Sequence, residues 1–491
     1  MSIDTSSDTS IDNGIDTGID TGLADFDAPA TPAALRGLAN GHVYVPGDAA
    51  YEQYRMAWNV TVDQHPAAVA VPHTAAEAAT VVRMAAELGL KVAPQSTGHN
   101  AGPLAQRGLA DVVLLRTDAL TSVTIDAERR VARVGGGAVW LPTVEAAAGH
   151  GLAALHGSSP DVGIAGYSLG GGIGWYARRL GMAANNITAV EMVTGSGDIV
   201  RADAEQNVDL FWALRGGGGN FGIVTALEFR LFPIQTAYAG MFVWDIADAE
   251  RVLLTYAEWA PTAPEEISSS FRIMRFPPIP EIPEPFRGRN LVVVNGAVLG
   301  PDAFAERVLG RFRALQPELD TWGRVPAASL ARLHMDPEGP TPAVADTALL
   351  GTFGESAVDA FLGAVGPDAQ TPLLIAELRQ LGGVLARRHP GAGALPQLDA
   401  AMAAIGISLT PTPEAFAAGR AAAAEYVAAL APYTTAKTYL NLAETAVDPR
   451  RGYGDDAWRR LTTIRTAVDP DDVILANHRI PRVFENGAAT A

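Results

Sequence analysis

Four glycine-rich loops in the first half of the chain have the composition of a ligand-binding site. They lie at 96–102, 135–137, 163–174 and 216–222. Glycine lets a backbone approach a ligand closely, and consecutive amides in such turns form concavities that bind anions. One such loop is usually only a turn, but four together favour a large ligand threaded between them. A nucleotide cofactor is the natural candidate.

The third loop contains two motifs that match other enzyme classes. Residues 166–170 fit the G-x-S-x-G nucleophile elbow of serine hydrolases, centred on Ser168. Residues 172–177 fit the G-x-G-x-x-A fingerprint of classical dinucleotide-binding folds. Both motifs must follow a buried strand, and the preceding residues contain proline and glycine instead. We therefore expect neither class, although a serine hydrolase remains an alternative.

His99 is the most informative single residue in these loops. It lies in a polar, glycine-flanked loop directly after a predicted strand at 91–94. No second His, Asp or Glu stands at metal-ligand spacing, so no metal site is predicted. The imidazole is therefore either a loop histidine hydrogen-bonded to backbone, or a nucleophile or covalent tether.

The elements that must position these loops alternate between helix and strand. Thr74 and Glu77 form a capping box that begins a helix at 74–88. The other expected elements are a strand at 111–116, hairpins at 122–134 and 187–201, helices at 140–148 and 209–214, and a strand at 221–232. Helices interleaved with antiparallel pairs predict an α+β fold.

After Pro233 the pattern changes to longer segments. The expected strands are 238–246, 268–276, 291–299 and 436–442, and the expected helices are 248–259, 302–314, 372–388, 414–430 and 456–467. Five large side chains in this part could face a pocket, but each alone is more typical of core or surface. They are Trp244, Phe271, Arg275, Trp322 and His334.

The composition excludes several functions. The 491 residues include no cysteine, which rules out disulfides, cysteine-ligated metals and a thiolate nucleophile. With 54 acidic and 36 basic side chains the net charge is −18, so nucleic acid and membranes are not expected partners. No apolar run reaches the ~20 residues that span a bilayer, and no signal sequence is visible. A cytoplasmic protein is expected, and nothing indicates its oligomeric state.

Several ordered blocks of the sequence resemble one known family. Residues 72–102, 157–174 and 181–222 resemble the PCMH-type FAD-binding module of the vanillyl-alcohol-oxidase superfamily, in its berberine-bridge-enzyme-like branch. Residues 438–441 and 453–454 resemble the C-terminal part of the same branch. The resemblance implies an α+β fold with a two-subdomain FAD-binding module and a substrate domain of antiparallel sheet backed by helices.

The domain limits combine this resemblance with composition. Residues 1–45 are rich in Asp, Ser, Thr and Gly and are predicted to be a disordered acidic tail. The FAD-binding domain is expected at 46–236 and the substrate-binding domain at 237–430. The segment 431–491 is expected to return to the FAD-binding domain.

The resemblance also implies how FAD is held. His99 occupies the position of the family's covalent histidine. Ser159 stands where relatives with a second tether carry cysteine, so a single histidyl link is expected. Val162 lies where relatives place a small residue that admits O2, which favours an oxidase. The residues implied in cofactor binding are Gln95, Ser96, Thr97, Gly98, His99, Asn100, Gly157, Ser158, Ser159, Val162, Gly163, Gly166, Ile223, Val224, Asn441 and Asn477.

The implied catalytic block departs from the family pattern. The family commonly shows Tyr-x-Asn-Tyr, and this chain has Tyr439, Asn441 and then Leu442. Tyr439 and Asn441 are the candidate catalytic residues, whereas Leu442 removes a tyrosine base used by some members. A neutral amine needs no protein base to transfer a hydride, so the loss suits amine chemistry.

The expected function is therefore an FAD-dependent oxidase acting on a small molecule. It would take a hydride from an alcohol or amine carbon of a natural-product-like substrate to flavin N5, with O2 as acceptor and H2O2 as product. Two alternatives stay open: a dehydrogenase of the same fold with another acceptor, and a flavin-binding protein without turnover.

Overall fold

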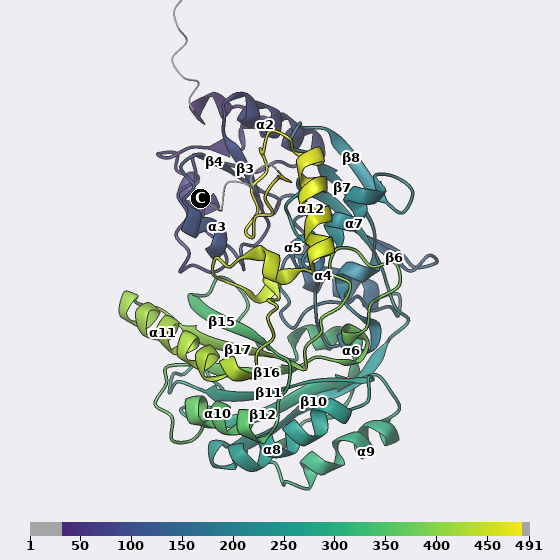
Figure 1. Cartoon of the computed structure of the whole chain (residues 1–491), viewed down its shortest axis with the longest axis vertical. Helices are drawn as coiled ribbons and strands as arrows, with labels where there is room; N and C mark the ends of the chain where they lie inside the picture. The colour runs from purple at the N-terminus through teal and green to yellow at the C-terminus, as the bar shows by residue number, and fades with distance from the viewer. Residues whose placement is uncertain (1–31, 484–491) are drawn as a thin grey trace, which may run out of the picture.

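The computed structural model describes residues 32–483, which contain three β-sheets (Figure 1). Two smaller sheets lie together in the upper half of the view, and a large sheet lies below them. The sequence-based prediction of an α+β class is confirmed. Within the described residues no helix combines the length and apolar character needed to cross a membrane.

The first sheet carries the loop that contains His99. Its strand order is β1-β2-β4-β3, and β2, β4 and β3 are parallel. The elements are β1 Val43–Tyr44, β2 Ala68–Ala70, β3 Lys91–Gln95 and β4 Val112–Arg116, with helices α1 Tyr51–Tyr54, α2 Ala75–Glu87 and α3 Gly102–Arg107. Helix α2 begins as predicted, because the Glu77 amide donates to the Thr74 hydroxyl at 3.1 Å.

The predicted tail needs a correction at its C-terminal end. Its residues 1–31 lie outside the described residues. Residues 32–45 instead form two 3-10 turns, Pro32–Leu35 and Ala39–Gly41, followed by β1. Leu35 and Val43 are buried beside α2, and β1 pairs with β2. The apolar side chains of this segment are buried against the first sheet and α2, which favours an ordered conformation. They are Leu35, Ala39, Val43 and Val45.

The second sheet is antiparallel, with the order β5-β6-β9-β7-β8. Its strands are β5 Val123–Asp126, β6 Val131–Gly135, β7 Ile187–Val193, β8 Ile199–Asp203 and β9 Ile223–Arg230, and its helices are α4 Trp140–Ala148, α5 Ile164–Leu169, α6 Ala177–Leu180 and α7 Val208–Gly217. The two predicted hairpins are confirmed as β5–β6 and β7–β8. Ser168 is buried inside α5 and does not lie at a strand-to-helix turn, so the serine-hydrolase alternative fails.

The third sheet has eight strands, all antiparallel to their neighbours. They are β10 Thr236–Asp245, β11 Ile267–Arg275, β12 Asn290–Val298, β13 Leu319–Asp320, β14 Gly323–Pro326, β15 Ala343–Leu350, β16 Ile375–Gln380 and β17 Met402–Leu409. Four helices accompany it: α8 Ala249–Trp259, α9 Asp302–Arg313, α10 Glu355–Val365 and α11 Pro413–Ala429. Helices α8, α9 and α10 cover the face turned away from the two smaller sheets (Figure 1).

Two expected elements in this part are wrong. The helix expected at 372–388 is strand β16, paired on both sides with β11 and β17, and Gly382 and Gly383 with positive φ end the segment. The strand expected at 436–442 is irregular and closes with a 3-10 turn, Leu440–Leu442. Its residues bond to loops and not to a strand, as Thr438 does when its amide donates to the Arg451 carbonyl.

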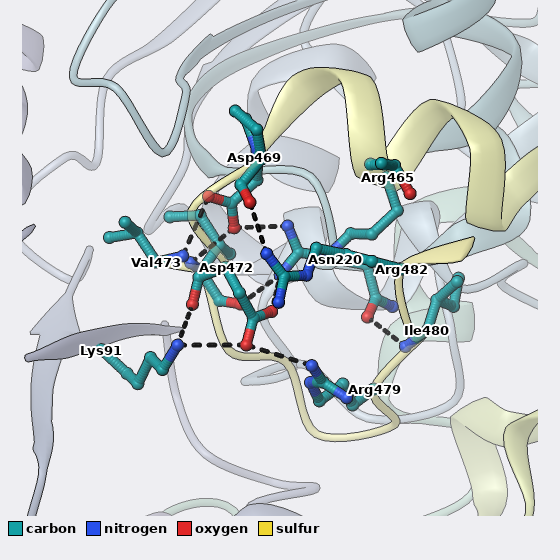
Figure 2. Close-up of polar contacts among 12 residues, drawn as sticks. Lys91, Asn220, Arg465, Asp469, Asp472, Val473, Arg479, Ile480 and Arg482 are labelled. Atoms are coloured by element: carbon teal, nitrogen blue, oxygen red, sulfur yellow. Dashed lines mark hydrogen bonds and ion pairs between the residues drawn. The ribbon is translucent and has the colours of Figure 1, made fainter. Parts of the chain in front are cut away.

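The C-terminal segment runs back to the first sheet. Helix α12 spans Asp455–Val468, and after it Ile474 pairs with Val92 of β3 in a parallel bridge. A buried group of charges fixes this return, with Arg465 bonded to Asp469 and Asp472, and Asp472 paired with Lys91 and Arg479 (Figure 2). We call these five residues the C-terminal ion network.

The same return is tied to the fourth glycine-rich loop. Asn220 accepts a hydrogen bond from the Ile480 amide at 2.8 Å and donates to the His478 carbonyl at 3.1 Å (Figure 2). These bonds fix the backbone next to Asn477, which itself reaches the loop after β3.

Candidate functional site

The loop after β3 presents His99 in a constrained setting. Gly98 has a positive φ of 81°, which lets the chain reverse direction immediately before His99. The imidazole stacks on the Trp58 indole, with ring centroids 4.0 Å apart. Its Nδ1 lies 2.7 Å from the Thr97 hydroxyl, and its Nε2 lies 3.6 Å from Asp161 Oδ1. The ring is therefore held from three sides.

Asp161 joins this histidine to the loop that precedes β15 of the third sheet. Its Oδ2 accepts hydrogen bonds from the Trp58 indole at 2.6 Å and from the Gly339 amide at 2.8 Å. Burial acts to raise the pKa of Asp161, but His99, the Gly339 amide and Trp58 outweigh it and lower that pKa. Asp161 is thus a carboxylate at neutral pH, and a carboxylate can only accept. Its negative charge favours the histidine tautomer that carries its proton on Nε2, while the 3.6 Å separation is too long for a hydrogen bond and leaves Nε2 without a hydrogen-bond partner among residues 32–483.

The loop has polar atoms suited to a polar ligand. Gln95 Nε2, Ser96 Oγ, His99 Nε2 and Asn100 Oδ1 are buried and have no hydrogen-bond partner among residues 32–483. Buried polar groups in proteins are almost always paired, so four unpaired atoms in six residues indicate a missing partner. The phosphates, ribitol and ring edge of FAD supply such partners, and this loop therefore fits FAD.

The loop at 157–163 lies directly against the loop after β3. A Cβ at Gly163 would stand 2.8 Å from Ser96 Oγ, and one at Gly157 would stand 3.0 Å from the Tyr167 ring. Gly166 faces open space, since nothing lies within 4 Å of a Cβ built there. Glycine at 157 and 163 is thus explained by close contact, whereas no contact requires glycine at 166.

The remaining predicted cofactor residues lie at three places in the structure. Ile223 and Val224 begin β9 and are buried in the cores of the first and second sheets. Val162 is half-buried, and its carbonyl accepts from the Trp140 amide at 3.2 Å. Asn477 donates to the Asn100 carbonyl, so it lies at the loop after β3.

Tyr439 and Asn441 hold the third glycine-rich loop. The Tyr439 hydroxyl accepts from the Gly172 amide at 2.7 Å, and Asn441 donates to the Tyr167 carbonyl at 2.8 Å. Burial is the main cause that raises the pKa of Tyr439 above its usual value. Its hydroxyl is therefore a poor base, and the contacts suit a role in positioning.

The sequence did not predict a group of polar and charged side chains that gathers at one face of the third sheet. Arg272 on β11 stands directly opposite Glu377 on β16, and Arg379 lies two residues further along the same face. Arg379 Nε bonds Glu377 at 2.8 Å, and Arg272 donates to the carbonyl of His334 at 3.2 Å. We call Arg272, His334, Asp336, Glu377 and Arg379 the sheet-face cluster.

This cluster meets the loop at 157–163. Asp336 accepts from the Ser159 hydroxyl at 2.5 Å, and the His334 ring stacks on Trp175 at 5.1 Å. Burial raises the pKa of Asp336, whereas burial and the nearby arginines hold the pKa of His334 well below its usual value. The cluster therefore contains a neutral histidine.

A small cavity opens beside the cluster. It is lined from one side by Ser158 and Trp175 and from the third sheet by Ser268, Gln380 and Arg379. Among residues 32–483 no three acidic or histidine side chains gather as a metal site would require.

Of the five pocket candidates from the sequence, only His334 belongs to this region. Trp244, Phe271 and Trp322 are buried in the core on the helix-covered face. Arg275 donates to the Val365 and Gly366 carbonyls at the end of α10. One signal for the cluster was visible in the sequence, because Arg272 and Glu377 each stand between apolar neighbours, in Phe271–Ile273 and in Ala376–Leu378.

Comparison with known proteins supports the FAD assignment. Residues 66–203 match the sequence model of the FAD binding domain family. The chain is 35% identical over 216 residues to (R)-6-hydroxynicotine oxidase of Paenarthrobacter nicotinovorans, covering 44% of this chain and 46% of that protein. It is 33% identical over 222 residues to glucooligosaccharide oxidase of Sarocladium strictum, covering 44% of each. The chain thus spans about half the length of the curated relatives it matches.

Solved structures share the whole fold. The chain resembles 6-hydroxy-D-nicotine oxidase from Arthrobacter nicotinovorans with a TM-score of 0.77 and 24% identity, covering 89% of this chain and 96% of the other. It resembles a variant of Physcomitrella patens BBE-like 1 with a TM-score of 0.80 and 21% identity, covering 92% and 99%. The resemblance and the fold class predicted from the sequence are confirmed.

Proposed function

We propose that this chain is an FAD-dependent oxidase that acts on an alcohol or amine carbon of a small natural-product-like molecule. FAD, when bound, accepts a hydride at its N5 atom and passes two electrons to O2, which leaves as H2O2. The chain's own contribution is to hold the cofactor, orient the substrate beside it and exclude water.

One observation carries this proposal more than any other. Four unpartnered buried polar atoms lie in the loop from Gln95 to Asn100, inside the FAD binding domain. Leaving such atoms unpaired costs about 1–3 kcal/mol each. A cofactor that bonds them would recover that free energy on binding.

We propose His99 as the only covalent tether. Asp161 favours a proton on Nε2, which leaves a lone pair on Nδ1 beside the Thr97 hydroxyl. Stacking on Trp58 restricts rotation of the ring. At position 159 a serine bonded to Asp336 leaves no second attachment point of the familiar kind.

The choice of oxidase over dehydrogenase rests on position 162 and on the relatives. Val162 stands where the family places a small residue that admits O2, and the curated relatives reported above are named oxidases. Tyr439 and Asn441 stay the proposed catalytic residues, and their contacts with the 167–172 segment suit orientation of the site.

The tether is tested by acid precipitation of purified protein. Yellow colour should remain with the precipitate in the wild type, and His99→Ala should release the flavin into the supernatant. His150→Ala, which changes an exposed histidine, is the matched control and should retain the colour. Complete release of flavin from the wild type would reject the tether.

The oxidase activity is tested by anaerobic reduction followed by mixing with air. Rapid return of the oxidised flavin spectrum with one H2O2 per flavin is expected. Reoxidation that takes many minutes would favour the dehydrogenase. Absence of bleaching by a broad panel of alcohols and amines would reject turnover.

A further inference from the structure

Arg272 has fewer partners than its burial requires. Its side chain is 1% exposed, in the middle of β11. One nitrogen donates to the His334 carbonyl at 3.2 Å, whereas Nε and Nη2 have no partner among residues 32–483. The ion pairs of the same part of the chain do not include Arg272. A buried guanidinium in this state is costly to keep.

The neighbouring charges do not neutralise this guanidinium. Glu377 is engaged with Arg379 through a contact of 2.8 Å. Asp336, which accepts from Ser159, has a pKa raised by burial, so its negative charge is disfavoured. His334 is neutral. Within the described residues Arg272 therefore forms no ion pair with a neighbouring carboxylate, and its Nε and Nη2 stay available to an acceptor from outside the cluster.

Arg379 connects Arg272 to the cavity described above. It lies diagonally across from Arg272 on the same face of the sheet, lines the cavity and is 19% exposed. Ser268 and Gln380 add hydroxyl and amide groups to the same wall, and Trp175 supplies an aromatic surface opposite them. The guanidinium groups of Arg379, which lines the cavity, and of its buried neighbour Arg272 match the planar, bidentate geometry of a carboxylate.

We propose that this cavity binds a carboxylate on the guanidinium groups of Arg272 and Arg379. The inference rests on the proposed function, because the carboxylate would belong to the molecule that the oxidase acts on. The substrate class is thereby narrowed to alcohols or amines that carry a carboxylate. Binding would supply the acceptors that Nε and Nη2 of Arg272 lack.

The test is a calorimetric titration of the flavin-loaded protein with benzoate and with benzamide. The two probes have nearly the same shape and differ in charge. Benzoate should bind at least tenfold more tightly and should perturb the visible flavin spectrum. Arg272→Met and Arg379→Gln should each weaken benzoate at least tenfold. Arg311→Gln, which removes an exposed arginine on α9, should leave benzoate affinity unchanged.

Substrate kinetics give a second measurement. Among substrates found in the alcohol and amine panel, a carboxylate should show a KM at least tenfold below that of its own amide. Arg272→Met should raise the KM of the carboxylate alone and leave that of the amide unchanged. Circular dichroism and flavin content establish that the variants fold.

Two results would overturn the inference. The first is equal affinity for benzoate and benzamide. The second is undiminished benzoate affinity in Arg272→Met. If that variant also shows a changed flavin midpoint potential, Arg272 serves the cofactor and not the substrate. Failure of the proposed function looks different: the protein would carry no flavin, and calorimetry would still report benzoate binding.

Discussion

Two groups of buried charges in this molecule are built in opposite ways. In the C-terminal ion network, Arg465 bonds Asp469, Asp472 and the Ile474 carbonyl, with only Nε unpaired among the described residues. In the sheet-face cluster, Arg272 bonds a single carbonyl and pairs with no carboxylate in that range. Both arginines are 1% exposed. The contrast therefore lies in pairing and not in burial.

The difference in pairing corresponds to the parts of the fold that each group of charges connects. The C-terminal ion network connects α12 and the residues after it to β3, inside one continuous part of the fold (Figure 2). The sheet-face cluster lies where the third sheet meets the loop at 157–163 and where a cavity opens. Charges paired with carboxylates fix the backbone, whereas a charge without a carboxylate partner keeps capacity for a ligand.

The largest expected loss of stability comes from breaking the C-terminal ion network. Arg465→Met leaves Asp469 and Asp472 without their buried cation, so the free energy of unfolding should fall by about 3–5 kcal/mol. Urea unfolding followed by circular dichroism measures the loss. Arg459→Met, on the exposed side of the same helix, should cost less than about 1 kcal/mol. Equal losses in the two variants would contradict the structural role of the network.

Replacing the buried arginine of the sheet-face cluster by methionine should not lower the free energy of unfolding. Arg272→Met removes a charge that the fold does not pair, so the free energy of unfolding should stay unchanged or rise by up to about 2 kcal/mol. The measurement is again urea unfolding, in buffer without carboxylates. A loss as large as that of Arg465→Met would show that Arg272 is structural, and the comparison would fail.

The pH dependence of stability should separate the two groups as well. Burial acts to raise the pKa of Asp472, but Lys91, Arg479 and Arg465 outweigh it and lower that pKa. A lowered pKa gives stability that is present above the unfolded value of ~3.9 and is lost as pH falls. Asp472→Asn should therefore destabilise the protein at pH 7, with a deficit that shrinks toward pH 3.

The contribution of Asp336 to stability should depend on pH in the opposite direction. Burial raises its pKa in spite of Ser159, Arg272 and Arg379, which lower it, while Glu377 adds to the rise. Its stabilising contribution is complete below the unfolded value of ~3.9 and is lost as pH rises through the folded pKa. Asp336→Asn should stabilise the protein at pH 7 and lose that advantage near pH 4. Parallel pH profiles of the two variants would contradict the comparison.

Much of the fold was readable from the sequence because local signals agreed with tertiary structure. The Thr74 cap and the β7–β8 hairpin, which turns at Gly195–Gly197, are examples. The strand β16 was misread because its apolar residues also fit helical spacing, and only pairing with β11 and β17 decides the matter. The turn at Leu440 likewise depends on a distant loop, because Asn100 donates to the Leu440 carbonyl at 3.3 Å.

The candidate site was readable only in part. The loop from Gln95 to Asn100 was found because its residues are consecutive and match a family pattern. The sheet-face cluster was missed because Arg272 and Glu377 come together through strand register, which sequence alone does not fix. His334 reaches them from a loop whose path depends on Gly339 bonding Asp161.

The smallest expected loss of stability comes from Lys91, at the exposed edge of the C-terminal ion network. Lys91 is 27% exposed, and its ammonium lies 3.0 Å from Asp472, which keeps Arg465 and Arg479 as other partners. Lys91→Met should therefore cost only about 0.5–1 kcal/mol, and the cost should shrink in 1 M salt because exposed pairs are screened. Urea unfolding at low and high salt measures both. A loss close to that of Arg465→Met, or one insensitive to salt, would mean that the network depends on its rim as much as on its buried centre.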